Sequence, residues 1–173
     1  MYQTQIHSTI SDVKYAVFSD IAMKDVGEKV GQLFVGGEYV ELIGDVGAGK
    51  TTFTKGLAKG LGISEPVQSP TFNISRIYAA RDGLSLCHYD FYRLNEAGIM
   101  ENELDEALNS SRNVTVVEWG GVVEGILPED RLRLSIAATG ETERLLEFDS
   151  FGERSTQILR DLEEKLKWSY YWT

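Results

Sequence analysis

The sequence predicts an α/β three-layer domain with a mixed, mostly parallel sheet that contains an antiparallel hairpin. Strand-like apolar runs alternate with runs of helical periodicity, and an Asp-Gly pair separates two of the strand-like runs. No linker or internal repeat divides the chain. With 173 residues, 42% of them hydrophobic and 25% charged, the chain has the size and composition of one globular domain. We therefore treat residues 1–173 as a single domain.

The first two predicted elements are a strand and an amphipathic helix. Residues 13–18 are rich in β-branched and aromatic side chains, which favour a strand. Ser19 and Asp20 are suitable N-caps for a helix that ends at the glycine pair 36–37. The apolar face of this helix repeats at Ala22, Val26, Val30 and Leu33.

A glycine-rich loop follows the second predicted strand, residues 38–43. Its sequence is Gly44-Asp45-Val46-Gly47-Ala48-Gly49-Lys50-Thr51, which matches the phosphate-binding pattern G-x-x-x-x-G-K-[ST] at every fixed position. The run that follows it, residues 51–61, has helical periodicity and closes at Gly62. A match between a strand and a helix is the context that the motif requires. The sequence therefore predicts a P-loop NTPase-like domain that binds a nucleoside triphosphate.

The motif assigns a role to each residue of the loop. Backbone N–H groups from about Gly47, through Ala48 and Gly49, to Thr52 are expected to surround phosphate oxygens at the positive end of the helix. Lys50 is expected to reach the β- and γ-phosphates and to face solvent when no nucleotide is bound. The Thr51 hydroxyl is expected to bind Mg²⁺. Thr52 either contacts the α-phosphate or is a plain helix-start threonine.

The middle of the chain predicts a loop, a hairpin and a helix. Residues 63–71 contain two prolines and predict an ordered loop or a switch. Residues 72–80 and 84–90 are strand-like and flank Arg81-Asp82-Gly83, a strong hairpin signal. An amphipathic helix with an acidic outer face then runs through Ala97, Met100, Leu104, Ala107 and Leu108.

The last part predicts a central strand, a second hairpin and a C-terminal helix. Residues 114–117 form a short, continuously apolar run that is typical of a central strand. Residues 131–138 and 144–148 flank Thr139-Gly140-Glu141 as a hairpin, and the apolar repeat from Ile158 to Leu166 indicates a helix. The aromatic tail, residues 168–173, is either a docking element or a frayed end.

Two predicted strands end in carboxylates, Asp90 and Glu118. The carboxyl ends of strands in an α/β sheet face the ligand crevice, so both residues are candidates, with Lys50, for catalysis. Both are also candidate metal ligands beside Thr51. Glu118 is the better residue to hold Mg²⁺ directly or through water, and Asp90 could share the metal or orient the attacking water. The sequence does not separate these roles, and both residues could also be ordinary strand-end turn residues.

The roles of three neighbours of these carboxylates remain open. His88 and Asp90 point the same way in an alternating strand, so His88 is either paired with Asp90 or purely structural. Arg93 could neutralise γ-phosphate charge or hold a structural ion pair. Trp119 could stack on the base, contact a partner or lie in the core.

Charge and composition restrict the partners and the compartment. The net charge of −10 argues against direct, independent binding of nucleic acid, which requires a surplus of basic residues. The acidic surface suits a basic partner protein, or it is simply a solvated face. One cysteine, no signal-like N-terminus and no apolar run of membrane-spanning length predict a cytoplasmic protein that does not bind membranes. The guanine-reading N-K-x-D signature is absent, so ATP with Mg²⁺ is the predicted ligand.

Four segments together resemble one family, the bacterial TsaE (YjeE) ATPases. They are the phosphate loop extended to Phe53, Ser69-Pro70-Thr71-Phe72, His88-Tyr89-Asp90-Phe91-Tyr92-Arg93-Leu94 and Val117-Glu118-Trp119-Gly120. Their order and spacing fit over about residues 15–150. Many families share the phosphate loop, and the other three segments make the resemblance specific. The aromatic tail and Val46, where leucine is frequent, depart from the family pattern.

The resemblance implies a small ATPase that serves the threonylcarbamoyl modification of adenosine beside the tRNA anticodon. It implies association with TsaD and TsaB, a role in their repeated turnover, and contact with tRNA only through that complex. It implies that Lys50 and Thr51 bind phosphate and Mg²⁺, and that Asp90 and Glu118 are the acidic pair needed for hydrolysis. It also implies that Ser69 to Thr71, with Thr71 at the nucleotide, is a nucleotide-sensing switch and that Trp119 lines the site.

Two other functions are compatible with the residues. A small-molecule or nucleoside kinase has a similar length and fold class, and Asp90 with Arg93 could hold an acceptor hydroxyl. No arginine-rich lid follows the central strands, which argues against it. A nucleotide-sensing scaffold, in which hydrolysis is incidental, is the non-enzymatic alternative.

Overall fold

A computed structural model describes residues 10–70, 72–92, 94, 95 and 98–169. Its strands are β1 (Ile10–Val17), β2 (Tyr39–Ile43), β3 (Ser75–Ala79), β4 (Ser85–Asp90), β5 (Asn113–Glu118), β6 (Arg131–Ala138) and β7 (Arg144–Phe151). Its α-helices are α1 (Asp20–Leu33), α2 (Lys50–Gly60), α3 (Ile99–Leu108) and α4 (Glu153–Ser169). Short 3₁₀ segments occupy Arg81–Gly83 and Gly120–Ile126.

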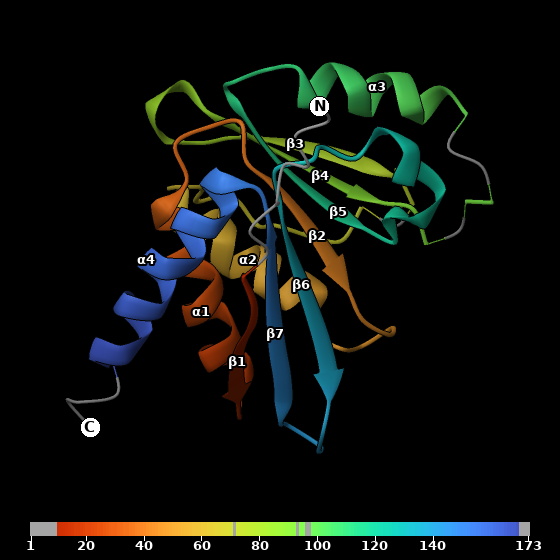
Figure 1. The fold of residues 1–173 in the computed structure, drawn as a ribbon. Coiled ribbons are helices and arrows are strands. Elements are labelled where there is room, and N and C mark those ends of the chain that lie inside the picture. Colours follow the sequence, from red (N-terminus) through yellow and green to blue (C-terminus); the bar gives the residue numbers. More distant parts are fainter. Residues whose placement is uncertain (1–9, 71, 93, 96–97, 170–173) are drawn as a thin grey trace, which may run out of the picture.

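All seven strands form one sheet in the order β1-β7-β6-β2-β5-β4-β3 (Figure 1). The four central strands, β6, β2, β5 and β4, are parallel, and antiparallel strands flank them on both sides. The predicted fold class is thus confirmed, and so are both predicted hairpins, β3–β4 and β6–β7. The pairing of β1 with β7 joins the first and the last strand of the sheet in sequence order, and no local pattern in the sequence predicts it.

Helices cover both faces of the sheet and complete the three layers (Figure 1). Helices α1, α2 and α4 pack on one face, and α3 packs with the 120–126 segment on the other. Alternation along β2 divides its side chains between two cores: Val40 and Leu42 face α1 and α2, whereas Tyr39 faces the other layer. On β5, Val116 and Val117 divide in the same way. The end of β5 therefore presents Glu118 to the α2 layer.

Helices α1 and α2 approach each other closely through glycines. A Cβ atom at Gly56 of α2 would lie 2.1 Å from the Lys24 carbonyl oxygen of α1. A Cβ at Gly31 of α1 would likewise lie 2.2 Å from the Leu57 carbonyl oxygen of α2. The two backbones are therefore in direct contact, and α2, which begins at the phosphate loop, is fixed against its neighbour.

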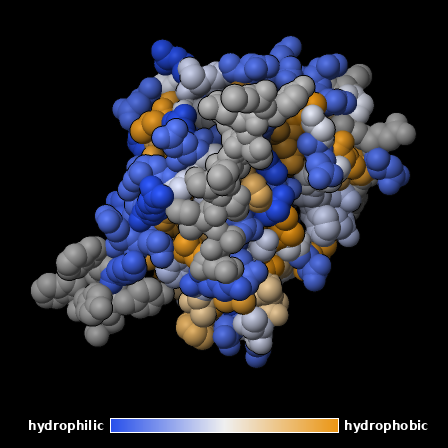
Figure 2. Space-filling model, in the orientation of Figure 1, coloured by the Kyte–Doolittle hydropathy of each residue, from blue (hydrophilic) through white to orange (hydrophobic). Residues whose placement is uncertain are grey.

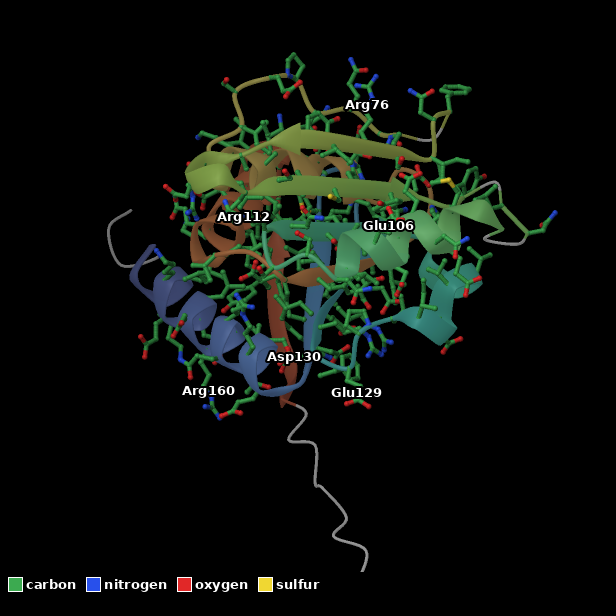
Figure 3. The ribbon with its side chains drawn as sticks, turned by 90° about the horizontal axis from the view of Figure 1, so that it is seen from above. Arg76, Glu106, Arg112, Glu129, Asp130 and Arg160 are labelled. Carbon is green, nitrogen blue, oxygen red and sulfur yellow. The ribbon has the colours of Figure 1, made fainter. Side chains whose placement is uncertain are left out.

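The face of the molecule that Figure 1 presents is mostly polar. Figure 2 shows hydrophilic residues over most of one face, with hydrophobic residues in scattered patches. Seen from above, Arg76 and Arg160 point outward from the rim of the molecule (Figure 3). Among the residues that the structure describes, no helix has the length and apolarity to cross a membrane. The aromatic tail beyond residue 169 lies outside the described residues, so its docking role remains a hypothesis.

Candidate functional site

The site begins where β2 runs through the glycine-rich loop into α2. Gly49 is the N-cap of α2 and has φ 113° and ψ 14°, a left-handed conformation that glycine adopts without a steric penalty. As a glycine it provides no side-chain cap, and the helical hydrogen bonds begin with Phe53 N–H donating to the Gly49 carbonyl oxygen at 2.9 Å. The first N–H groups of a helix have no partner within it. An anion at this terminus would therefore take the place of the missing cap.

Lys50 is folded onto the loop in this structure. Its Nζ donates to the carbonyl oxygens of Gly44 at 2.6 Å and Asp45 at 3.0 Å, and it lies 4.7 Å from the ring centroid of Trp119. Only 6% of the residue is exposed. The expectation that Lys50 faces solvent without nucleotide is therefore wrong, because the loop's own carbonyl groups and the indole ring hold the ammonium group.

A cavity of about 440 Å³ opens in front of the start of α2, and we call it the phosphate cavity because it lies at the predicted phosphate loop. The structure brings most of the predicted site residues to it, from the loop, from two strand ends and from the segment after residue 68. Its lining includes Gly47, Gly49, Lys50, Thr51, Thr52, Asp90, Glu118 and Trp119, together with Val46, Ser69, Phe72 and Tyr92.

Ala48 differs from the other predicted loop residues because it points into the protein. It is 4% exposed, its N–H donates to the Asp45 carbonyl oxygen at 3.1 Å, and its own carbonyl accepts from Arg144 Nε at 3.0 Å. Arg144 thereby links the loop to the turn of the β6–β7 hairpin. Two other residues considered above, Thr71 and Arg93, lie outside the described residues.

The two carboxylates are adjacent at the end of the parallel core. Asp90 and Glu118 are register partners on β4 and β5, and they are 5% and 3% exposed. Asp90 accepts hydrogen bonds from Ser69 Oγ at 2.9 Å and from Tyr92 N–H at 3.0 Å. The topology therefore places both candidate acids at one edge of the cavity, as the strand-end argument predicts.

Asp90 is held both by Ser69, in the predicted switch, and by Ile74, which follows it. Besides the Ser69 contact, the Asp90 N–H donates to the Ile74 carbonyl oxygen at 2.8 Å. Ile74 has φ 66°, a left-handed conformation that is unfavourable for a β-branched residue. The N–H groups of Asn73 and Ile74 both donate to the Pro70 carbonyl oxygen and close a tight turn. The strained backbone of Ile74 and the hydrogen bonds to Asp90 thus occur together beside the cavity.

Glu118 has a different partner. Its Oε1 lies 2.9 Å from Nε2 of His88, and both side chains are almost completely buried. His88 does lie on the same face of β4 as Asp90, but it binds Glu118 instead. Asp90 is engaged by Ser69 and Tyr92, while the parallel register brings Glu118 within reach of the imidazole.

Trp119 forms one wall of the cavity. Its backbone is left-handed, with φ 59° and ψ 42°, and the residue is 37% exposed, so it is not a core tryptophan. Its ring lies 5.1 Å from that of Tyr92, centroid to centroid, and against Lys50. The Tyr92–Trp119 pair also lines a second cavity of about 550 Å³, whose lining includes Glu41, Phe91 and Gly121.

The donor set of the phosphate cavity suits a divalent magnesium ion. Thr51, Asp90 and Glu118 bring a hydroxyl group and two carboxylates to the same cavity. Oxygen donors of this kind are the ligands that Mg²⁺ prefers, and phosphate oxygens usually complete its coordination. The residues present therefore fit the predicted metal, and its binding stays a prediction.

Sequence reasoning missed three contacts of the site. Asp90 and Glu118 were predicted from their positions at strand ends, but the hydrogen-bond partners Ser69 and His88 depend on the pairing of distant segments. The Arg144 contact with the loop depends on β6 lying beside β2. Tyr92 carried a local signal, since a residue two positions after a strand-end aspartate is well placed to donate its N–H to that side chain.

Comparison with known proteins supplies the family. A family model described as "Threonylcarbamoyl adenosine biosynthesis protein TsaE" matches residues 18–146. A Bacillus subtilis protein named "tRNA threonylcarbamoyladenosine biosynthesis protein TsaE" is 43% identical over 130 residues, which cover 73% of this chain and 78% of the relative. A Streptomyces coelicolor protein of the same name is 48% identical over 124 residues, 69% of this chain and 82% of the relative.

A solved structure agrees. The crystal structure of Bacillus subtilis YdiB superposes with a TM-score of 0.75 and 34% sequence identity, covering 90% of this chain and 97% of YdiB. The family match spans the phosphate loop, both strand-end carboxylates and Trp119. The chain belongs to the TsaE family.

Proposed function

We propose that this protein binds ATP with Mg²⁺ in the phosphate cavity and hydrolyses it to ADP and phosphate. One observation carries the proposal. The uncapped start of α2, Lys50, Thr51 and two buried carboxylates from neighbouring strands all meet at one cavity. Phosphoryl transfer requires this combination: donors for the phosphates, positive charge at the transferred group and carboxylates that place a metal and a nucleophile.

Each group would act on a defined part of the nucleotide. The N–H groups at the start of α2 would hold phosphate oxygens, and Lys50 would leave the carbonyl groups of Gly44 and Asp45 to reach the β- and γ-phosphates. Mg²⁺, held by Thr51 and the carboxylates, would neutralise developing charge on the phosphates. Asp90 and Glu118 would orient the attacking water, and Trp119 would limit access to the cavity.

We further propose that hydrolysis serves the threonylcarbamoyl modification of tRNA adenosine beside the anticodon. Relatives that are 43% and 48% identical bear the name of that biosynthesis. We infer that the protein acts on a complex of TsaD and TsaB, permits its repeated turnover and contacts tRNA only through it. The net charge of −10 supports an indirect role, because a free acidic surface repels tRNA and favours a basic partner.

Phosphate release from ATP, with and without purified TsaD and TsaB, tests this function. We expect a slow rate for the protein alone and a faster rate with both partners. A rate that no combination of partners raises above a Lys50→Ala control would contradict it. Co-purification of the complex with and without ATP then separates loss of binding from loss of hydrolysis.

A small-molecule kinase is the second candidate, and the second cavity is the observation that favours it. That cavity, about 550 Å³, shares Tyr92 and Trp119 with the phosphate cavity and so lies next to it. An acceptor bound there would be adjacent to the γ-phosphate. Mass spectrometry of metabolite mixtures incubated with ATP distinguishes the two functions: a phosphorylated metabolite supports the kinase, whereas ADP and free phosphate support the ATPase.

A further inference from the structure

His88 lies beneath the phosphate cavity with its side chain fully buried. Its Nε2 is 2.9 Å from Glu118 Oε1, across the parallel β4–β5 pair. In that pair His88 is level with Val116, two residues deeper in the sheet than Glu118. Glu118 lines the cavity. The imidazole therefore supports the carboxylate from the core side.

The surroundings of the ring favour one tautomer. A carboxylate only accepts hydrogen bonds, so the contact with Glu118 requires a proton on Nε2. Nδ1 is buried and has no hydrogen-bond partner within the described part of the chain. A proton on Nδ1 would leave a buried donor unpaired and would bring a lone pair against the carboxylate. With the proton on Nε2, the ring is left with only an unused acceptor.

A histidine at this position is not explained by packing. Its neighbours Leu86 and Val116, on the same face of the sheet, are both 0% exposed and belong to the apolar core. An apolar side chain would fill such a site without burying polar atoms. The polar contact that the structure gives the imidazole is with Glu118, so the reason for a histidine is found at the carboxylate.

We propose that His88 is a positioning residue, whose Nε2–H holds the Glu118 carboxylate toward the phosphate cavity. The proposal rests on the proposed function, because it assigns a task to Glu118 in metal placement and hydrolysis. The proposal also distinguishes the two acids by the residues that hold them. Glu118 is fixed by a core residue, whereas Asp90 is held by Ser69 and Tyr92, which line the cavity.

Two polar substitutions of His88 test the position of the donor. In His88→Gln the amide nitrogen reaches the place of Nε2, whereas in His88→Asn it stops one bond short. We expect His88→Asn to lower phosphate release about 10- to 100-fold and to raise the Mg²⁺ concentration for half-maximal release by a similar factor. His88→Gln should recover most of that loss. Both variants should bind ATP in EDTA within about twofold of wild type, since the phosphate loop is unchanged.

Equal losses in His88→Gln and His88→Asn would overturn the proposal. So would a fall in ATP affinity in EDTA that matches the fall in release, because both results would indicate general damage to the fold and not a lost donor. Thermal unfolding of both variants provides the common reference. The comparison uses the full chain throughout.

Nuclear magnetic resonance tests the contact without nucleotide or turnover. The chain has two histidines, His7 and His88, so long-range ¹H–¹⁵N spectra of the imidazoles are simple to assign with His88→Gln as reference. We expect His88 in the Nε2–H form and a shift of its signals in Glu118→Ala. An Nδ1–H form, or no response to Glu118→Ala, refutes the proposal whatever the ATPase rate. The expected tautomer and response in a protein that fails to hydrolyse ATP would support the contact and reject the proposed function.

Discussion

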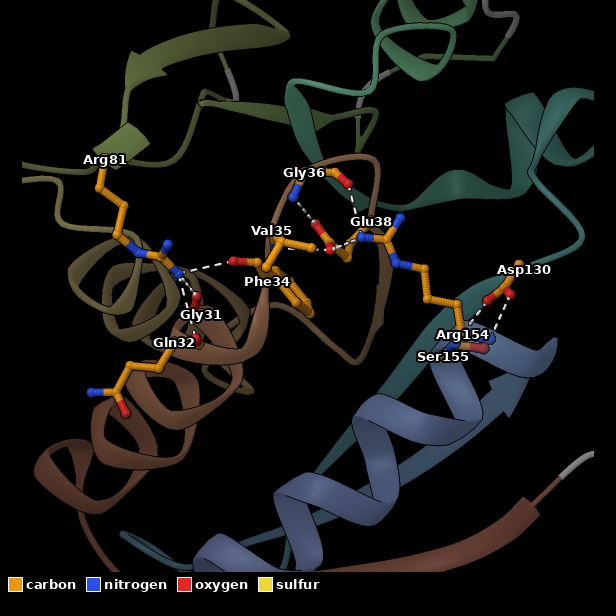
Figure 4. A network of polar contacts seen from close by, with 10 residues as sticks. All are labelled: Gly31, Gln32, Phe34, Val35, Gly36, Glu38, Arg81, Asp130, Arg154 and Ser155. Atoms are coloured by element: carbon orange, nitrogen blue, oxygen red, sulfur yellow. Dashed lines mark hydrogen bonds and ion pairs between the residues drawn. The ribbon is translucent and has the colours of Figure 1, made fainter. Parts of the chain in front are cut away.

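The amino ends of two helices differ in how their N–H groups are satisfied. At α4, Asp130 accepts hydrogen bonds from the N–H groups of Arg154 and Ser155, both at 2.9 Å (Figure 4). At α2, the N-cap is Gly49, which provides no side-chain acceptor, and a cavity lies in front of the helix. At α4 a carboxylate of the protein thus accepts from the first N–H groups of the helix. At α2 the corresponding N–H groups are left available for an anion.

The buried carboxylates beside these two termini follow the same distinction. Glu38, 6% exposed, accepts from the N–H groups of Val35 and Gly36 and from Arg154 (Figure 4). Glu118, 3% exposed, accepts from His88 and otherwise faces the cavity. A carboxylate surrounded by donors stabilises the fold, whereas one that has a single side-chain donor among the described residues and lines a cavity is available for a ligand. The comparison predicts that substitutions at the two ends affect different measurements.

The largest effect is expected for Glu118→Gln. The amide keeps the size of the side chain but removes the charge that would place the metal and the water, so ATP hydrolysis should fall about 10³-fold. ATP affinity should stay close to that of wild type. Single-turnover phosphate release and calorimetric titration measure the two quantities separately. Phosphate release at the wild-type rate by this variant would show that Glu118 has no role in hydrolysis. Glu118 would then not differ in function from Glu38.

At the other end, Glu38→Ala should affect stability and not turnover. It leaves two N–H groups and the Arg154 guanidinium without their buried acceptor, which should lower the free energy of unfolding by about 3 kcal/mol. Urea denaturation measures this loss. Phosphate release per folded molecule should be unchanged. A selective loss of release at full stability would show that the two ends are not separate in function.

Cys87 provides a comparison between the two faces of β4, because it lies beside His88 but packs against the α3 layer. Burial, and to a smaller extent the Glu103 charge, raises the pKa of its thiol from 9.0 to about 11. The folded state then retains a proton that the unfolded state releases. Between pH 9 and 11 the wild type should therefore lose up to about 2 kcal/mol more stability than Cys87→Ala. Urea denaturation at several pH values measures this difference in stability. If the free energy of unfolding fell in parallel with pH for the two proteins, the raised pKa of Cys87 would be contradicted.

The smallest effect is expected for Asp130→Ala, which removes the exposed cap of α4. Loss of an N-cap costs about 1 kcal/mol. ATP affinity should not change, since α4 begins at the opposite end of the sheet from the phosphate loop. Thermal unfolding and ATP titration of this variant test the distinction between the two helix ends. A weakened ATP affinity in this variant would mean that the termini are coupled.

Local patterns in the sequence predicted most of the fold. The strand–loop–helix order around Gly49, the Asp82-Gly83 hairpin and the Ser19 cap, which accepts from Ala22 N–H at 3.1 Å, all depend on neighbouring residues. The pairing of β1 with β7 and of β6 with β2 joins distant segments, and local periodicity carries no information about it.

The candidate site divides in the same way. The motif predicted Lys50 and Thr51, and the strand ends predicted Asp90 and Glu118. The burial of Lys50 was missed because it depends partly on carbonyl groups of its own loop and partly on Trp119, which follows the distant strand β5. The pairing of His88 with Glu118, in place of the Asp90 pairing considered from the sequence, was not predicted because it depends on the register of β4 with β5.

Calorimetric titration of the Mg²⁺-saturated full chain with ATP tests the central claim that the uncapped start of α2 is a polyphosphate site. One ATP should bind per chain, and Lys50→Ala should weaken that binding at least about tenfold while its thermal unfolding still shows a folded protein. Binding of equal strength in wild type and Lys50→Ala, or no heat from folded wild-type protein, would contradict the account.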